Sequence, residues 1–220
     1  MNAIVTMKRT ALIAAGLVLL MIAVFVATGI GQDALQAFKP PEQYTQTLLR
    51  DPATLRGVIG VDNAFILFYG TCFLLLGREL MNVGSNRALA MAGTALLMTT
   101  AVLDMVENLH FLSMIAMAQS SLAISAGEIA LQVWESLLKF HASYLGLFLL
   151  GLVMPARTPA LRLLAASLVY VQWPVGMLIY VGPESWTKPL IFVRLAFFLV
   201  GLLIIALTDW QKIVGSGARA

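Results

Sequence analysis

The chain alternates long apolar stretches with short polar connections, and this pattern predicts its main elements. Each apolar stretch has the roughly 20 residues that an α-helix needs to cross a bilayer. The stretches lack the two-residue alternation of transmembrane β-strands, so the pattern favours helices. We predict an all-α, polytopic transmembrane bundle with six spans. Their expected bounds are about 10–31, 57–77, 88–117, 127–153, 159–181 and 189–208.

The longest polar connection, residues 32–56, lies between the first two predicted spans. Asp51 followed by Pro52 is typical of a helix start, because an aspartate caps free N–H groups and proline fits the first turn. We expect the second helix to begin near Pro52 and a short interfacial helix around 44–49 to precede it. Pro174 should kink the fifth span, because it leaves a backbone carbonyl without its donor.

Composition places the chain among integral membrane proteins. Apolar residues make up 60% of its 220 residues and charged residues 11%, against roughly 25% charged residues in soluble domains. We expect one transmembrane domain over residues 1–220. The apolar core after Lys8 and Arg9 is longer than the roughly 7 to 15 residues of a signal peptide core, which favours a retained first span over a cleaved one. The single Cys72 excludes a disulfide framework within the chain.

Basic residues near the span ends predict the orientation, because they favour the cytoplasmic side. With the N-terminus inside, eight lie on that side and four on the other. The eight are Lys8, Arg9, Arg78, Arg87, Arg157, Arg162, Lys212 and Arg219, and the four are Lys39, Arg50, Arg56 and Lys188. We therefore expect a multi-pass protein of the inner (plasma) membrane, with both termini cytoplasmic and residues 32–56 outside. Anionic lipid explains the net charge of +3 without nucleic acid.

Two neighbouring predicted spans carry polar stripes inside apolar sequence. Asp104, Glu107 and Asn108 share one helix face, and Glu135 and Lys139 share a face of the next span. Burying charge in a bilayer is costly, so we expect the stripes to face each other inside the bundle. Counting from the turn near residue 122 places Asp104 and Lys139 at similar depth, which makes them the expected ion pair.

The same hairpin holds four carboxylates and one lysine, counting Glu128 and Glu135 with Asp104 and Glu107. Like charges in a poorly hydrated place favour protonation of some of them, so a shared proton or a bound cation would resolve the excess. The alternative is a structural polar network, in which Glu128 is hydrated and Glu135 pairs with Lys139 along one helix.

Further polar residues form a second group of candidates. Asp62 and Arg194 are expected at similar depth in the outer thirds of their spans, where they would form an ion pair unless Arg194 extends to the interface. His110 and His141 differ by about 10 Å in depth, so joint ligation of a metal or haem by the pair is not expected. Each histidine is expected to bond a neighbouring helix. We predict no metal site, and the cofactor remains open.

Aromatic residues add expectations about packing. Trp186 and Trp210 are expected at the outer and inner membrane interfaces, and Trp134 and Trp173 in the core.

Three functions fit this pattern. The first is a proton- or cation-linked transporter or permeation protein for a small solute or ion, with the proton on Asp104, Glu107 or Glu135 and Lys139 as counter-ion. The second is an intramembrane lipid hydrolase. The polar residues in the spans resemble the membrane zinc amidases of the alkaline ceramidase type, but that family uses three histidines and this chain has two, so no residue role is carried over. The third is an accessory subunit that meets a partner membrane subunit or a second copy.

Overall fold

The fold is a bundle of long helices. The computed structural model describes residues 2–83 and 86–217, and no strand occurs among them. The long helices are α1 (Ala3–Thr28), α3 (Pro52–Val83), α4 (Arg87–Gln119), α5 (Ala126–Val153), α6 (Pro159–Tyr170), α7 (Gln172–Val181) and α8 (Glu184–Leu207). Shorter elements are η1 (Asp33–Leu35), α2 (Pro41–Leu49) and α9 (Trp210–Gly217).

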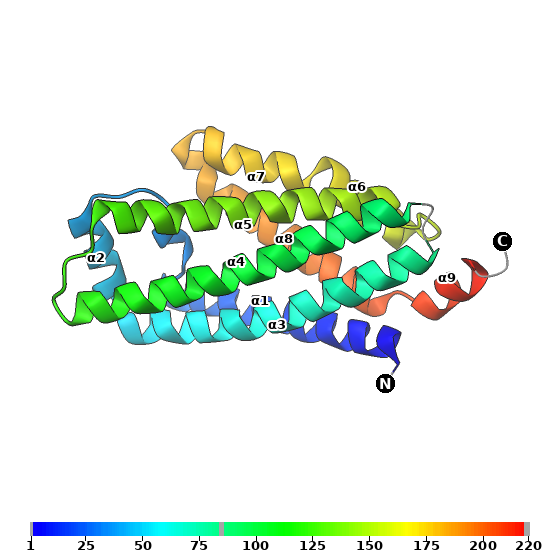
Figure 1. Cartoon of the computed structure of the whole chain (residues 1–220), viewed down its shortest axis with the longest axis horizontal. Helices are drawn as coiled ribbons and strands as arrows, with labels where there is room; N and C mark the ends of the chain where they lie inside the picture. Colours follow the sequence, from blue (N-terminus) through cyan, green and yellow to red (C-terminus); the bar gives the residue numbers. More distant parts are fainter. Residues whose placement is uncertain (1, 84–85, 218–220) are drawn as a thin grey trace.

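Six units are long and apolar enough to cross a membrane within the described residues, with α6 and α7 together making one of them. This confirms the prediction of an all-α, polytopic bundle with six spans. Figure 1 shows the long helices side by side, with the start of α1 and the end of α9 at one end. The segment that holds η1 and α2 lies at the opposite end. The protein is therefore a multi-pass membrane protein in which α1 begins and α9 ends at the same end of the bundle.

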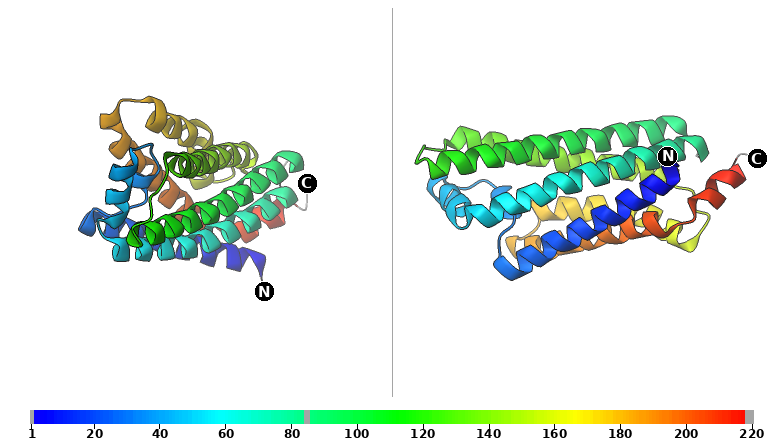
Figure 2. Two further views of the ribbon diagram at one scale, coloured as in Figure 1. Left: turned by 60° about the vertical axis from the view of Figure 1, so that its left-hand side comes forward. Right: turned by 90° about the horizontal axis from the view of Figure 1, so that it is seen from below.

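Helix neighbours follow largely from chain order. The helix α4 packs between α3 and α5, while α1 packs on α3 and α8, and α7 packs on α5 and α8. The view from below in Figure 2 shows α1 and α8 running together along the bundle beside α3. The short helix α2 packs against α3, α4 and α5.

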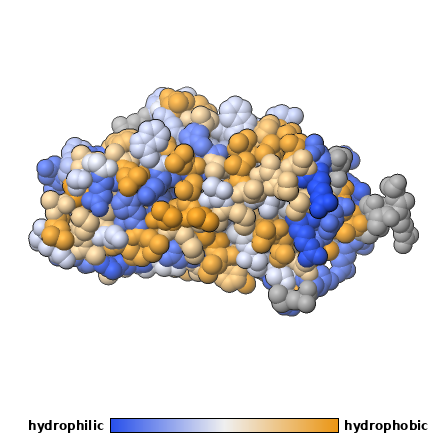
Figure 3. Space-filling model, in the orientation of Figure 1, coloured by the Kyte–Doolittle hydropathy of each residue, from blue (hydrophilic) through white to orange (hydrophobic). Residues whose placement is uncertain are grey.

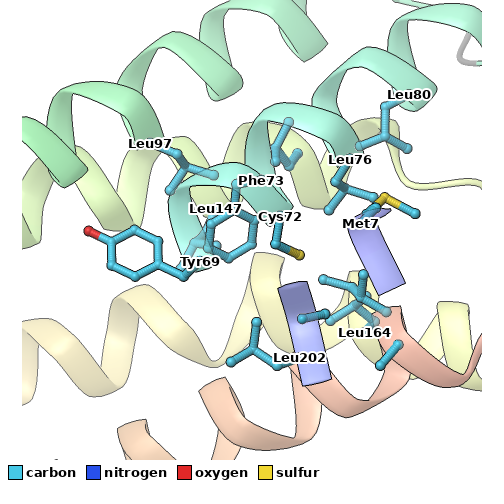
Figure 4. Close-up of a cluster of buried hydrophobic side chains, with 14 of the residues drawn as sticks. Met7, Tyr69, Cys72, Phe73, Leu76, Leu80, Leu97, Leu147, Leu164 and Leu202 are labelled. Carbon is cyan, nitrogen blue, oxygen red and sulfur yellow. The ribbon is translucent and has the colours of Figure 1, made fainter. Parts of the chain in front are cut away.

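Two apolar clusters fill the interior, one toward each end. Figure 4 shows the first, in which Met7 of α1 and Cys72 and Leu76 of α3 meet Leu164 of α6 and Leu202 of α8. The second joins the segment between α1 and α3, which holds η1 and α2, to the bundle and includes Tyr44, Leu48, Ile59, Phe111 and Ile129. On α4 and α5 the polar residues lie between these clusters in sequence. They are therefore held between two close-packed apolar layers.

The outer surface carries many large apolar side chains, as expected for contact with lipid. Leu109 on α4 is 63% exposed and Leu131 on α5 is 57% exposed. Figure 3 shows such hydrophobic residues spread over much of the visible face, with a concentration of hydrophilic residues toward its right-hand end.

The structure tests the predicted helix start at Asp51–Pro52, the predicted short helix before it and the predicted kink near Pro174. The Thr54 N–H donates to Asp51 Oδ1 at 3.0 Å at the start of α3, as the Asp51–Pro52 pair predicts. The predicted interfacial helix is present as α2, although it begins earlier, at Pro41. The fifth span is broken at Val171, between α6 and α7 and close to Pro174. The helix α9 was not predicted.

Three of the tryptophan predictions are wrong. Trp210 is fully buried, and its Nε1 donates to the Ile205 carbonyl at 2.9 Å, so it is a core residue. Trp134 and Trp173 are 56% and 45% exposed. Trp186 is 52% exposed, and its place at the outer membrane interface stays a prediction.

Candidate functional site

The centre of the site is the ammonium group of Lys139 on α5. It donates to Asp104 Oδ1 at 2.7 Å and also to Glu107 Oε2, and both acids belong to α4. Lys139 is 4% exposed, Asp104 8% and Glu107 0%. The predicted Asp104–Lys139 pair is confirmed, and the two polar stripes do face each other. Pairing of Lys139 with Glu135 along one helix is not the arrangement found.

Further donors surround the two acids. Ser136 Oγ donates to Glu107 Oε1, which Gln132 Nε2 also approaches at 3.4 Å. Tyr69 of α3 donates from its hydroxyl to Asp104 Oδ2 at 3.0 Å. Both oxygens of each acid therefore accept hydrogen bonds, so neither buried acid has an unsatisfied oxygen.

Asp62 of α3 brings a third buried carboxylate to the site. Asn108 Nδ2 donates to Asp62 Oδ2 at 2.7 Å and to Asn63 Oδ1 at 2.9 Å. Gln32 Nε2 lies 3.5 Å from the same Asp62 oxygen. Among the described residues, no donor contacts the second oxygen, Oδ1. Asp62 thus differs from Asp104 and Glu107, because its partners are neutral amides and they engage one oxygen.

The segment between α1 and α3 reaches into the site, which the sequence pattern did not reveal. Gln36 Nε2 donates toward Glu107 at 3.3 Å, and Gln32 Nε2 donates to Asn108 Oδ1 at 3.1 Å. Tyr44 of α2 has its hydroxyl 3.0 Å from Gln132 Oε1. Burial, with the nearby negative charge of Glu107, raises the pKa of Tyr44 above its ordinary value, so its hydroxyl stays protonated. These three side chains hold the segment between α1 and α3 against Lys139 and its two acids.

A cavity of about 250 Å³ opens beside these residues. Asp62, Asp104, Lys139 and Arg194 all line it. Much of its wall is aromatic and comes from α1, α3 and α8, and this wall includes Phe25, Phe65, Phe73, Phe192 and Phe198. A predominantly apolar pocket with a few convergent polar groups is the usual form of a small-molecule site.

Arg194 of α8 is placed against α5 instead of Asp62. Its Nη1 donates to the Tyr144 hydroxyl at 3.2 Å, and its Cζ lies 4.3 Å from the centroid of the Phe140 ring. The expected ion pair of Asp62 with Arg194 is therefore wrong. The two residues nevertheless line the same cavity. A shared cavity is compatible with the similar depth expected for the two residues. Depth alone, however, does not determine the direction in which each side chain points.

The histidines lie outside the charged centre. His110 Nδ1 is 2.9 Å from Glu135 Oε2, a contact between α4 and α5 of the helix-to-helix kind expected. His141 Nδ1 is 2.7 Å from the Leu137 carbonyl of its own helix, so the expected bond to another helix is not found for it. In residues 2–83 and 86–217, no three His, Cys, Asp or Glu side chains are grouped so as to hold a metal ion.

No protein-family model, curated protein or solved structure matches the chain. The site itself therefore carries the functional argument. It combines a cavity, a buried lysine paired with two acids, a third acid beside them and a second cation, Arg194, on the same lining. Such a site can bind a small solute and can take up or release a proton next to it.

Proposed function

We propose that the protein moves a small solute across the membrane and that a proton held in the buried carboxylate cluster is linked to this movement. The observation that carries the proposal is the cavity that reaches Asp62, Asp104 and Lys139. A solute in this cavity would lie beside ionisable groups that are otherwise enclosed by helices. Intramembrane ionisable residues facing a cavity are characteristic of substrate pathways and proton relays.

The buried cluster has three carboxylates and two nearby cations, so one carboxylate lacks a compensating positive charge. The Lys139 Nζ and the Arg194 Cζ lie 4.7 Å and 4.3 Å from the same Phe140 centroid, so they are separated by no more than the sum of these distances, about 9 Å. These two cations can balance Asp104 and Glu107. A third ionised carboxylate at Asp62 would be uncompensated, which is costly where water is scarce.

Asp62 is the acid best suited to hold the proton. Its Oδ1 has no donor among the described residues, so it can carry a proton without displacing a hydrogen bond. Asp104 and Glu107 would each lose a donor on protonation. For the same reason a proton fits the cluster better than a metal ion, which would need several oxygens that already accept N–H and O–H groups. The sequence-based hypothesis placed this proton on Asp104, Glu107 or Glu135.

The proposal includes the location and orientation of the protein. We place it in the inner (plasma) membrane with both termini in the cytoplasm, on the strength of the eight-to-four distribution of basic residues. The cavity residues Asp33 and Lys188 lie close to the outer end in chain position. The cavity would then be nearer the outer face in this conformation.

Uptake into proteoliposomes tests the proposal. The probes are mandelate, phenylethanediol and phenyltrimethylammonium, which share a phenyl group and carry negative, zero and positive charge. We expect an inward proton gradient to accelerate uptake of at least one probe, and Asp62→Asn to abolish this acceleration. Glu128→Gln, a carboxylate change in the first turn of α5 outside the cavity, is the control and should retain it. Uptake that equals protein-free liposomes for all three probes, or that ignores the gradient, contradicts the proposal.

A further inference from the structure

We infer that the solute is a small organic anion, a carboxylate on an apolar body, with the carboxylate bound at Arg194 and the body against the aromatic wall of the cavity. This inference rests on the proposed function and names the substrate class of the same site.

Arg194 is the group in the cavity with donors to spare. An arginine presents five N–H groups in a planar fork. Within the part of the chain that the structure describes, its one hydrogen bond goes to the Tyr144 hydroxyl. Among the described residues, no carboxylate lies within ion-pair distance of Arg194, whereas Lys139 contacts two. A carboxylate accepts two parallel bonds from such a fork, which is the strongest match available to it.

The acids of the cavity offer less to a cationic ligand. Asp104 already accepts from Lys139 and Tyr69. Asp62 accepts from Asn108 at Oδ2 and, under the proposed function, carries a proton on Oδ1, so it presents no negative charge to a cation. The remaining acid on the lining is Asp33 of η1, at the outer end. Lys188 also lines the cavity, six residues before Arg194 on α8. The α8 side thus presents two cations along the cavity wall, and neither has a carboxylate partner in the described structure.

The shape of the cavity favours a small ligand with an apolar body. Phe198 of α8 meets Phe65 and Phe73 of α3 with ring centroids 5.8 Å and 5.9 Å apart, which forms an aromatic wall. The cavity of about 250 Å³ is smaller than the roughly 300–1,000 Å³ pockets of drug-sized ligands. An anion the size of a benzoate matches this combination of wall and volume.

Anion binding would also favour proton binding at Asp62. Asp104 and Glu107 on α4 and Lys139 on α5 are the charges that act most directly on Asp62. Asp33 on η1 and Lys188 and Arg194 on α8 line the same cavity. An anion at Arg194 uses the positive charge that balances one of these acids, so the remaining acids hold a proton more tightly. By linkage the proton then strengthens binding of the anion by the same factor. The site would carry the anion and the proton together.

Fluorine NMR of ligand binding tests the inference on the full chain in nanodiscs of zwitterionic lipid. The probes are para-fluorobenzoate, para-fluorobenzamide and para-fluorobenzylamine, which share one ring and differ in charge. We expect the benzoate to bind about tenfold or more tightly than the other two, which is the scale of a charge-assisted bond. Arg194→Gln should reduce benzoate affinity to that of the benzamide. Arg56→Gln, which removes an arginine bonded to Gln119 outside the cavity, should leave it unchanged.

Several results would overturn the inference. These are equal binding of benzoate and benzamide, tighter binding of the benzylamine, or unchanged benzoate affinity in Arg194→Gln. Loss of benzoate binding when the nanodisc lipid is made anionic would assign Arg194 to a lipid headgroup and overturn it as well. If Arg194→Gln does not fold, the charge series on the wild-type protein and the variant Arg194→Lys, expected to bind the benzoate more weakly, decide the question.

The two proposals fail in different ways. Benzoate binding without proton-accelerated uptake of any probe would support the anion site and contradict transport. Proton-accelerated uptake of phenyltrimethylammonium in place of mandelate would support transport and contradict the anion site.

Discussion

At the scale of single residues, Lys139 organises the site because its ammonium group holds two carboxylates of the neighbouring helix. A buried ion pair contributes little net stability when complete, since desolvation offsets the attraction. Removing one partner is different, because the other charges remain buried without compensation. Replacing Lys139 alone should therefore lower the free energy of unfolding much more than the small net contribution of the complete ion pair.

We expect Lys139→Met to lower the free energy of unfolding by about 3–5 kcal/mol, because Asp104 and Glu107 lose their cation. Denaturant titration of the detergent-solubilised protein measures this change. The matched control is Lys212→Met, since Lys212 pairs with Asp209 at 3.0 Å on the exposed surface. The control should show no resolvable loss. A Lys139 variant as stable as that control would contradict the buried triad.

The sequence revealed some of these residues and concealed others for definite reasons. Asp104 and Lys139 could be matched by depth because they leave one short turn on two regular helices. Gln32 and Gln36 lie in an irregular segment, where no helical period relates sequence position to direction. For Asp62 and Arg194, counting residues along the helices gave a similar depth but not the direction in which each side chain points. Their predicted ion pair was therefore wrong, and the cavity that both line was not predicted.

At the scale of elements, the contact between α3 and α4 depends on the absence of a side chain at Gly77. A Cβ atom added there would overlap the side chain of Thr94, whose own Cβ would lie 2.9 Å away, so the helices could not keep their present separation. This close approach holds the end of α3 against the start of α4 beside the first apolar cluster.

Gly77→Ala should therefore destabilise the protein by about 1–3 kcal/mol, the usual range for overpacking. Gly57→Ala on the same helix is the control, because a Cβ atom there would meet nothing within 4 Å. That variant should be neutral or more stable by up to about 1 kcal/mol, since alanine favours helix over glycine. Thermal unfolding in detergent compares the pair, and an equal effect of the two changes would refute a tight seam at Gly77.

The start of α3 makes a separate prediction about pH. The Thr54 N–H bond to Asp51 lowers the pKa of that carboxyl below its ordinary value. The folded form therefore favours the ionised group, and its stabilising effect is present above the ordinary aspartate pKa and lost as the pH falls through the lowered one. Asp51→Asn caps without titrating. Between pH 7 and pH 3 the melting temperature of the wild type should fall further than that of this variant, and identical falls would argue against the cap.

The six spans were predictable because length and apolarity alone require them in a bilayer. The helix α9 and the place of Trp210 were not, because both depend on packing at the end of the bundle. A tryptophan near a span end is ordinarily an interfacial anchor. Here the chain turns after α8 at Thr208 and buries the Trp210 ring in the first apolar cluster. That turn has no strong local signal in the sequence.

At the scale of the whole molecule, the orientation in the membrane can be tested by labelling of introduced cysteines. In a Cys72→Ser background, Ser120→Cys lies in the outer turn and Asp209→Cys at the opposite end, and both positions are exposed. We expect a membrane-impermeant maleimide to label position 120 in intact spheroplasts and position 209 only after lysis. The reverse pattern would contradict cytoplasmic termini and leave the fold unchanged.

The whole account depends on one charge balance, in which the cluster formed by Asp62, Asp104, Glu107 and Lys139 keeps a proton near neutral pH. Infrared spectroscopy of the protein in nanodiscs measures this through the C=O stretching band of a protonated carboxyl group. We predict such a band at pH 7 in the wild type and in Glu128→Gln, and its disappearance in Asp62→Asn. A wild-type spectrum at pH 7 with every carboxyl group ionised would contradict the account.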